Sequence, residues 1–235
     1  MIPIRDTIPA RNPPIATWTL IIVNALAFLL ELTMAPPELD YFARLFGIVP
    51  ARYMHAEWAS AVGLSPSTYW PFLTSMFLHG SGLHLLGNMW TLWIFGDNVE
   101  DRLGRIPFAL FYLVTGIIGS VVQIVAAPES RVPVVGASGA ISGVLGAYIV
   151  MFPRKRVRVL LFYFIMEVPA LVVLGLWALT QLLNGAGSLT GGGAEEGGVA
   201  YLAHVGGFAS GVLGALIWRA ISPGPRPRGR LPFDY

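Results

Sequence analysis

Charged residues divide this chain into long apolar windows. Uncharged stretches run over 12–30, 58–96, 106–128, 132–153 and 197–218, and a further one, 159–194, is interrupted only by Glu167. A helix that crosses a hydrocarbon layer of about 30 Å needs roughly 20 residues. Window 58–96 exceeds one span and begins like a loop, so we expect its helix from about Trp70 or Leu83 to Phe95. The pattern predicts an all-α bundle of six transmembrane helices in one domain, 1–221, followed by a disordered tail, 222–235.

Composition supports a membrane location. Only 12% of the 235 residues are Asp, Glu, Lys or Arg, whereas 55% are apolar. A folded soluble domain usually carries about twice that charged fraction, so the composition indicates a polytopic membrane protein. The chain has no cysteine, which excludes disulfides, cysteine-based zinc sites and thiol nucleophiles. Any chemistry must therefore come from hydroxyl, imidazole, amide or carboxylate groups.

The basic residues predict the orientation in the membrane. All but three of the 15 Lys and Arg residues lie in loops that share a side with the N-terminus; the exceptions are Arg44, Arg52 and Arg131. Short loops rich in Lys and Arg stay in the cytoplasm, so both termini are expected there, with the first apolar window as an uncleaved helix. The basic clusters suit anionic lipid headgroups and need no nucleic-acid partner. The expected location is a cell membrane, in the simplest case a bacterial inner membrane.

Four polar residues stand out inside the apolar windows: His84, Asn88, Ser138 and His204. Each is costly in hydrocarbon unless it faces other protein groups or water. His84 and Asn88 are four residues apart, so on a helix they share one face. Two interpretations are open for this pair: it holds neighbouring helices together, or it supplies hydrogen-bond donors to a reactive site.

Ser138 lies in Gly136-Ala137-Ser138-Gly139, where the fourth helix is expected to begin. Ala140 breaks the hydrolase motif Gly-x-Ser-x-Gly, so the motif alone is equally consistent with an ordinary serine. The position is more informative than the motif. At a helix N-terminus, free backbone N–H groups and the positive end of the helix dipole face the hydroxyl, where they would stabilise an oxyanion.

His204 lies near the outer end of the sixth window, at a depth similar to that of Ser138. A neutral imidazole is the usual base for an alcohol nucleophile. Glycines spaced four residues apart follow both side chains: Gly139 and Gly143 after the serine, Gly207 and Gly211 after the histidine. Small residues at this spacing allow helices to approach closely. The pattern therefore predicts that helices four and six pack together and bring a nucleophile to its base.

With these residues in this order, the chain resembles the rhomboid intramembrane serine proteases over nearly its whole length, up to Trp218. The matching motifs are His79…His84-Leu85-Leu86-Gly87-Asn88, Glu100-Asp101-Arg102-Leu103-Gly104, Gly136-Ala137-Ser138-Gly139 and Ala203-His204-Val205-Gly206-Gly207…Gly211. The resemblance implies a serine endopeptidase that cleaves single-pass transmembrane proteins through an acyl-enzyme, with no cofactor and no metal. The spans would enclose a polar cavity open to the outer side, and the first loop, 35–69, would lie at the interface.

The resemblance also assigns roles to individual residues. Ser138 would be the nucleophile and His204 the general base of a Ser–His dyad, because no Asp is placed to orient the histidine. His84, Asn88 and the backbone N–H of Ser138 would stabilise the oxyanion.

Other matches to the family carry weaker assignments. Glu100 and Arg102 match a pair that holds the loop after the second helix; a cytoplasmic charge cluster at a helix end is an equal alternative. Trp177 and Gln181 resemble a family pair, which we interpret as packing plus one hydrogen bond at the lateral substrate entrance. His79 is expected to line the water entry.

Some residues depart from the family pattern. Ser142 stands where an aromatic residue commonly packs against the base, so Tyr201 or Phe208 would have to support His204. Glu167 is expected midway along the fifth helix, as a structural or water-facing acid with no family role. His55 is expected to be an exposed loop residue.

Two other classes of function compete with the protease. A rhomboid-like binding protein would hold or escort membrane helices without catalysis; such relatives typically lack the Ser or the His, and both are present here. A small-solute transporter would also need polar residues inside the membrane. Against a transporter, no inverted repeat is visible, and the polar residues cluster toward the outer side instead of the midplane.

Overall fold

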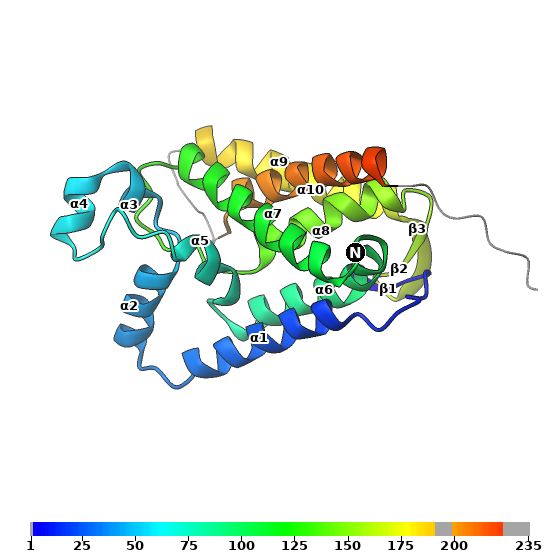
Figure 1. The fold of residues 1–235 in the computed structure, drawn as a ribbon, viewed down its shortest axis with the longest axis horizontal. Coiled ribbons are helices and arrows are strands. Elements are labelled where there is room, and N and C mark those ends of the chain that lie inside the picture. Colours follow the sequence, from blue (N-terminus) through cyan, green and yellow to red (C-terminus); the bar gives the residue numbers. More distant parts are fainter. Residues whose placement is uncertain (1, 191–198, 223–235) are drawn as a thin grey trace, which may run out of the picture.

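The computed structural model describes residues 2–190 and 199–222, most of them helical. Within these ranges six long helices form the body of the molecule (Figure 1): α1 (Ile15–Glu31), α6 (Gly82–Leu103), α7 (Arg105–Ala126), α8 (Ser138–Met151), α9 (Ala170–Thr190) and α10 (Tyr201–Ile221). One end carries the short helices α2 (Pro36–Phe46), α3 (Pro50–Met54), α4 (Ala56–Ala61) and α5 (Pro71–Thr74) and the 3-10 turn η1 (Ser75–Phe77). The expected tail lies, after Ser222, outside the described residues.

Three helices in the described ranges, α7, α9 and α10, are long and apolar enough to cross a membrane, judged by length and composition. Helices α1 and α8 are apolar but shorter. Helix α6 has the length, yet its last turns carry Asp97, Glu100, Asp101 and Arg102. The mainly helical fold agrees with the sequence, whereas the number of six spans stays a prediction.

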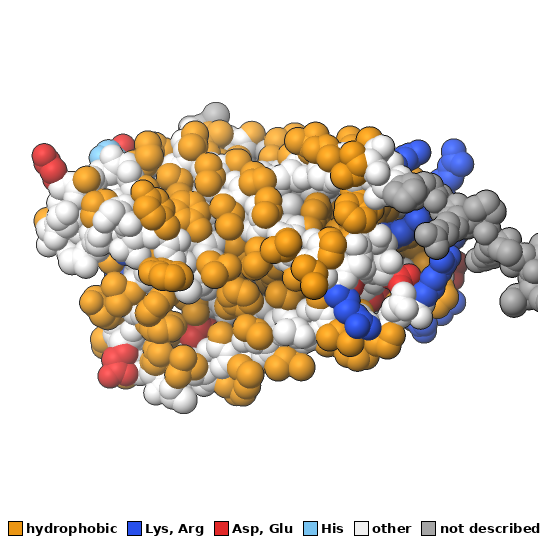
Figure 2. All heavy atoms as spheres, viewed as in Figure 1, with side chains coloured by type: hydrophobic (Ala, Val, Ile, Leu, Met, Phe, Trp, Pro, Cys, Tyr) orange, Lys and Arg blue, Asp and Glu red, His pale blue; other side chains and the backbone are white. Residues whose placement is uncertain are grey.

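The expectation of an all-α chain is wrong at the end opposite the short helices. There β1 (Ile2–Asp6), β2 (Arg156–Leu161) and β3 (Phe164–Pro169) form an antiparallel sheet in the order β1-β2-β3 (Figure 1). In β2, Val157 and Val159 are buried while Arg156 and Arg158 are exposed, which is the two-residue period of a strand. Figure 2 shows Lys and Arg side chains gathered at this end, whereas hydrophobic side chains dominate the rest of the visible face.

Glu167 is the residue whose position this sheet changes most. It lies in β3 and not midway along a helix, because α9 begins only at Ala170, directly after Pro169. Its partner across the β2–β3 ladder is Arg158, whose Nε donates to Glu167 Oε1 at 3.0 Å. Both side chains are partly exposed. Glu167 is therefore a paired surface acid, and the interpretation of it as a carboxylate within the fifth helix is wrong.

Helix α8 lies at the centre of the bundle, where every residue from Ala140 to Tyr148 is buried. Its contact with α10 runs through backbone atoms: a Cβ on Gly207 would overlap the carbonyl oxygen of Gly139, and a Cβ on Gly211 that of Gly143. Such close approach leaves little freedom for the two helices to shift against each other. The first turns of α8 and α10 are fixed relative to each other as a result.

Glu100 connects α6 to the beginning of α1. Its buried carboxylate accepts hydrogen bonds from the N–H of Ala16 at 3.0 Å, the N–H of Thr17 at 2.8 Å and the Thr17 hydroxyl at 2.8 Å. A carboxylate in this place satisfies N–H groups that a helix leaves free at its start. Arg102 lies over the ring of Phe152 at the end of α8, 5.5 Å from the ring centroid. Glu100 thus contacts the start of α1, and Arg102 contacts the residue after α8. That this pair also holds the loop after α6 stays a prediction.

Candidate active site

Ser138 is the first residue of α8, so its backbone N–H belongs to the group without an intrahelical partner. The turn that leads into the helix contains Gly136, whose φ is +128°. This conformation strains any residue that has a side chain. A Cβ on Gly136 would also lie 2.7 Å from Nε2 of His84. Glycine is thus required at this position for two independent reasons.

Ser138 and His204 meet where α8 and α10 contact each other. The distance between Ser138 Oγ and His204 Nε2 is 2.7 Å, as expected for a hydrogen bond donated by a hydroxyl. His204 lies in the first turn of α10 and is 9% exposed. The start of this helix is held by Gln123 of α7, whose Oε1 accepts the N–H of Ala203 at 3.1 Å.

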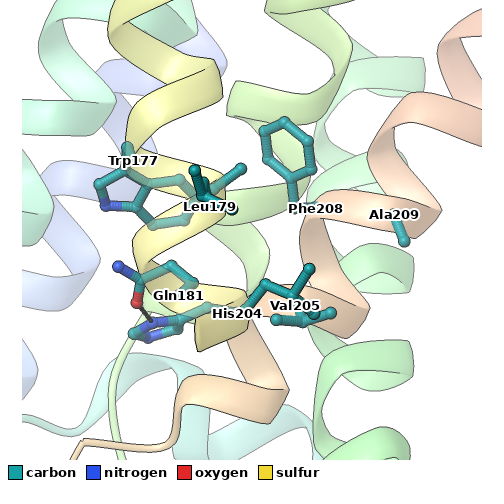
Figure 3. Close-up of a pocket in the computed structure, with 9 residues that line it drawn as sticks. Trp177, Leu179, Gln181, His204, Val205, Phe208 and Ala209 are labelled. Atoms are coloured by element: carbon teal, nitrogen blue, oxygen red, sulfur yellow. Dashed lines mark hydrogen bonds between the residues drawn. The ribbon is translucent and has the colours of Figure 1, made fainter. Parts of the chain in front are cut away.

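A residue of α9 contacts the other nitrogen of the imidazole. His204 Nδ1 lies 2.8 Å from Gln181 Oε1, the contact drawn as a dashed line in Figure 3. An amide oxygen can only accept a hydrogen bond, so Nδ1 carries the hydrogen and Nε2 of the neutral ring is free to accept from Ser138. The sequence assigned Gln181 one hydrogen bond but gave no sign of its partner, because the spacing within one helix does not show what that helix faces.

The His204 ring is flanked by aromatic residues of α9 and α10. The Trp177 ring lies 6.1 Å away and the Tyr201 ring 6.5 Å away, edge-on. Phe208 packs against Trp177 at 6.0 Å. The hydroxyl of Ser142 donates at 2.6 Å to a carbonyl oxygen one turn earlier in α8, so this side chain is occupied within its own helix.

His84 and Asn88 of α6 approach the turn before Ser138. The position that a Cβ of Gly136 would take lies 2.7 Å from His84 Nε2 and 3.6 Å from Asn88 Nδ2. The two nitrogen atoms therefore converge on the backbone two residues before the serine.

His79 braces Asn88. Asn88 Nδ2 donates to His79 Nε2 at 3.0 Å, and the backbone N–H of His79 donates to Glu31 at 3.1 Å. Burial, with a smaller contribution from His84, lowers the pKa of the His79 imidazole to about 4, so the ring is neutral at pH 7 and able to accept. His79 is only 2% exposed, which argues against the expected position along an open water path. His55 lies far from this cluster, partly exposed and 2.9 Å from Glu129.

Two cavities adjoin the Ser138–His204 pair. One of about 20 Å³ is lined by polar side chains and small residues, namely Ser75, Ser120, Gly136, Ser138, Gly139 and Ala203 among others. This volume is enough for about one water molecule. The other, of about 250 Å³, lies between α9 and α10 (Figure 3) and is mainly apolar; its lining includes Trp177, Gln181, Leu182, His204, Val205 and Phe208.

This arrangement is suited to acyl transfer. A hydroxyl on the first residue of a helix is hydrogen-bonded to a neutral imidazole, and two further side-chain nitrogen atoms converge nearby. In the part of the chain that the structure describes, no three His, Asp or Glu side chains are grouped so as to hold a metal ion.

Comparison with known proteins identifies the family to which the chain is similar. The model of the Rhomboid domain family matches residues 66–220. Rhomboid protease GluP of Bacillus subtilis is 40% identical over 94 residues, 39% of this chain and 18% of that protein. Rhomboid protein 1, mitochondrial, of Saccharomyces cerevisiae is 36% identical over 143 residues, 59% of this chain and 39% of that protein. RHOMBOID-like protein 4 of Arabidopsis thaliana is 35% identical over 144 residues, 61% and 32% respectively. The chain spans less than half the length of the curated relatives it matches.

Proposed function

The chain belongs to the rhomboid family, and from this premise we propose that it is an intramembrane serine endopeptidase that cleaves transmembrane segments of membrane proteins. The observation that carries the proposal is the hydrogen bond of 2.7 Å between Ser138 Oγ and His204 Nε2. Two of the relatives named above are called rhomboid protein or RHOMBOID-like protein, and GluP is called a protease, so activity has to be argued from the site of this chain.

In the proposed reaction, Ser138 attacks the carbonyl carbon of the scissile peptide bond. His204 Nε2 takes the hydroxyl proton as the serine oxygen forms its bond to carbon. When the tetrahedral intermediate collapses, the imidazolium gives this proton to the leaving amine, and an ester of Ser138 remains. A water molecule then attacks the ester while one of its protons passes to His204. As this second tetrahedral intermediate collapses, the imidazolium returns the proton to Ser138 Oγ, the ester bond breaks and the carboxylic acid is released. The cavity of about 20 Å³ beside Ser138 has room for such a water.

The negative charge of the tetrahedral intermediate needs donors that are in place before the reaction. We assign this role to the backbone N–H of Ser138 and to the side chains of His84 and Asn88, whose nitrogen atoms converge on Gly136. Donors of this kind contribute most in a buried site, because they do not have to reorganise as charge develops. The hydrogen bond from Asn88 Nδ2 to His79 Nε2 fixes the orientation of the Asn88 side-chain amide.

The substrate class follows from the position of the site among apolar helices. A transmembrane helix hides its carbonyl groups in its own hydrogen bonds, so we propose that substrates are single-pass proteins with small, helix-destabilising residues at the cleavage site. We further propose that the chain is a multi-pass protein of six spans with both termini in the cytoplasm, in a plasma membrane, in the simplest case a bacterial inner membrane. Relatives include mitochondrial proteins, so the type of membrane is part of the proposal.

The function is tested with purified protein in liposomes and a fluorescent transmembrane substrate. We expect cleavage by the wild type and none above background by Ser138→Ala or His204→Ala. The matched control is Ser210→Ala, because this α10 hydroxyl bonds only to a carbonyl of its own helix in the described structure; its cleavage rate should equal that of the wild type. A fluorophosphonate should label the wild type and not Ser138→Ala.

Two results would count against the enzyme. Undiminished cleavage by Ser138→Ala would exclude the proposed nucleophile. Failure of the wild type to cleave any of a broad panel of transmembrane substrates or to react with the fluorophosphonate would favour the alternative, a rhomboid-like protein that binds or escorts membrane helices without catalysis.

A further inference from the structure

Gln181 belongs to a chain of hydrogen bonds that runs from α9 to Ser138. The Thr180 hydroxyl donates to the carbonyl oxygen of Trp177 at 2.6 Å, and Gln181 Nε2 donates to Thr180 Oγ1 at 3.3 Å. His204 Nδ1 donates to Gln181 Oε1 at 2.8 Å, and the Ser138 hydroxyl donates to His204 Nε2 at 2.7 Å. Each of these four hydrogen bonds joins a donor to an acceptor.

The Thr180 hydroxyl, the first donor in this series of hydrogen bonds, determines which way the Gln181 amide is oriented. The hydrogen of the Thr180 hydroxyl points to Trp177, so the oxygen is left to accept, and the –NH₂ group of Gln181 must face it. The amide oxygen of Gln181 then faces His204. An imidazole that donates from Nδ1 has its lone pair on Nε2, which is the form that a base for Ser138 requires.

The buried surroundings of Gln181 strengthen its hydrogen bond to His204. Gln181 and His204 are each 9% exposed, and both border the apolar cavity between α9 and α10 (Figure 3). A hydrogen bond is stronger where water is excluded, and leaving one buried partner unpaired there is correspondingly costly. A change at Gln181 should therefore affect the orientation of the imidazole more than a change at a solvated glutamine would.

We propose that Gln181 is the positioning residue of the Ser138–His204 pair. Its amide oxygen takes the place that a carboxylate has in Ser-His-Asp sites, where it fixes the tautomer and the orientation of the histidine. Gln181 does not touch the substrate in this role; it acts through His204. The inference rests on the proposed peptidase function.

The test compares Gln181→Met, Gln181→Asn and Gln181→Glu in liposomes. Methionine matches the length of glutamine without the acceptor, and asparagine withdraws the acceptor by one methylene. Both should lower kcat by about tenfold or more, the equivalent of one lost hydrogen bond, with KM within about twofold of the wild type because no substrate contact changes. Glutamate presents an acceptor oxygen at the same place in either protonation state, so its kcat should stay within about threefold of the wild type.

Thr180→Val is a milder perturbation. It removes the hydroxyl that orients the Gln181 amide but leaves the Gln181 amide oxygen that accepts from His204. Its kcat should fall less than that of Gln181→Met. Melting temperatures measured in the same detergent identify variants that do not fold, and if Gln181→Met is one of them, the Asn and Glu variants decide. Wild-type kcat in the Asn or Met variant, or equal losses in Asn and Glu, would overturn the positioning role. An inactive wild type would instead overturn the proposed function.

A second inference comes from the hairpin that β2 and β3 form. Its tip carries four exposed apolar residues, Phe162, Tyr163, Phe164 and Ile165, which are 82%, 95%, 73% and 66% exposed. Phe162 has φ +54°, a conformation that turns normally give to Gly, Asn or Asp because bulky residues are strained there. An aromatic residue in this place is poor turn chemistry, which indicates that the ring is retained for a contact outside the turn.

The contact is indicated by the charges beside the tip. Arg154, Lys155, Arg156 and Arg158 are exposed at the base of the hairpin, and Figure 2 shows Lys and Arg side chains gathered at this end of the bundle. Aromatic rings next to basic side chains are typical of protein segments at the headgroup level of an anionic leaflet. We infer that the hairpin tip, Phe162–Ile165, inserts at the membrane interface and that the basic residues bind anionic phospholipid headgroups.

The absence of cysteine in the chain makes a direct test simple. Tyr163→Cys, labelled with an environment-sensitive fluorophore, is placed in nanodiscs of phosphatidylcholine alone or with phosphatidylglycerol, each containing doxyl-labelled lipid. We expect quenching of the probe, stronger with phosphatidylglycerol, and reduced to the phosphatidylcholine level when Arg154→Gln and Lys155→Gln are added. A probe at Glu57→Cys on α4, at the opposite end, should not respond to these two substitutions. No quenching in either nanodisc would overturn the insertion, and equal quenching in both would overturn the anionic headgroup as the partner.

Discussion

Replacing Gly207 by alanine tests whether the close contact of α8 and α10 holds the catalytic geometry. A Cβ at position 207 would overlap the carbonyl oxygen of Gly139 and lie 2.9 Å from its carbonyl carbon. Two non-bonded carbon atoms normally lie about 3.5–4.0 Å apart. The two helices would therefore have to separate by roughly 0.6–1 Å to admit the Cβ. The Ser138 Oγ to His204 Nε2 distance, now 2.7 Å, would then reach the limit of a hydrogen bond. A misplacement of about 1 Å lowers the rate by about 100-fold.

The assay measures kcat on the transmembrane substrate, fluorophosphonate labelling and the melting temperature together. Overpacking should also destabilise Gly207→Ala by about 1–3 kcal/mol. Gly175→Ala in α9 is the matched control, since its Cβ would meet no atom within 4 Å, and a glycine-to-alanine change within a helix usually stabilises it by about 0.5–1 kcal/mol. Gly207→Ala with wild-type kcat and labelling would refute the reasoning, because the dyad would then tolerate displacement of its helices.

Three further changes test individual contacts. Asn88→Ala should lower kcat by about 100- to 1,000-fold, as the loss of one oxyanion donor does, together with a lower melting temperature, because the buried Nε2 of His79 loses its donor; a loss confined to KM would contradict the assignment. Glu100→Gln should lower the free energy of unfolding by about 1–3 kcal/mol, because one amide oxygen cannot replace both carboxylate oxygens toward Ala16 and Thr17; thermal unfolding measures this loss. Burial raises the pKa of Asp6 above 3.8, so the native state holds this proton more tightly, and the Asp6 contribution to stability should fall as pH rises through the raised pKa. The melting temperature of the wild type relative to Asp6→Asn should accordingly decline over that range, and a rising difference would contradict it.

The expectations that were closest to the structure came from residues whose type conflicts with their surroundings. Ser138 and His204 are polar residues in apolar windows, and the glycines at intervals of four after each indicated which helices approach one another. In the structure these glycines lie at the α8–α10 contact. Sequence spacing carries this information because a helix repeats its faces every three to four residues.

Other features were not visible in the pattern for a physical reason. Residues 156–169 carry few charges at the boundary with an apolar window, and a run of apolar residues does not separate a buried helix from a strand. The alternation of Arg156, Val157, Arg158 and Val159 was the available signal for β2. The partner of Gln181 could not be predicted, because the spacing of residues within one helix does not show which neighbouring helix that face meets.

The small side chain of Ser142 and the hydrogen bond from His204 to Gln181 both relate to the close packing of α8 against α10. The Cβ position of Gly207 lies 3.3 Å from the Cβ of Ser142, and Ser142 is fully buried, so the α8–α10 contact has no room at this level for an aromatic side chain between the helices. With α8 this close to α10, support for the imidazole has to come from another helix. Helix α9 supplies it, through the amide of Gln181 at 2.8 Å and the ring of Trp177 at 6.1 Å.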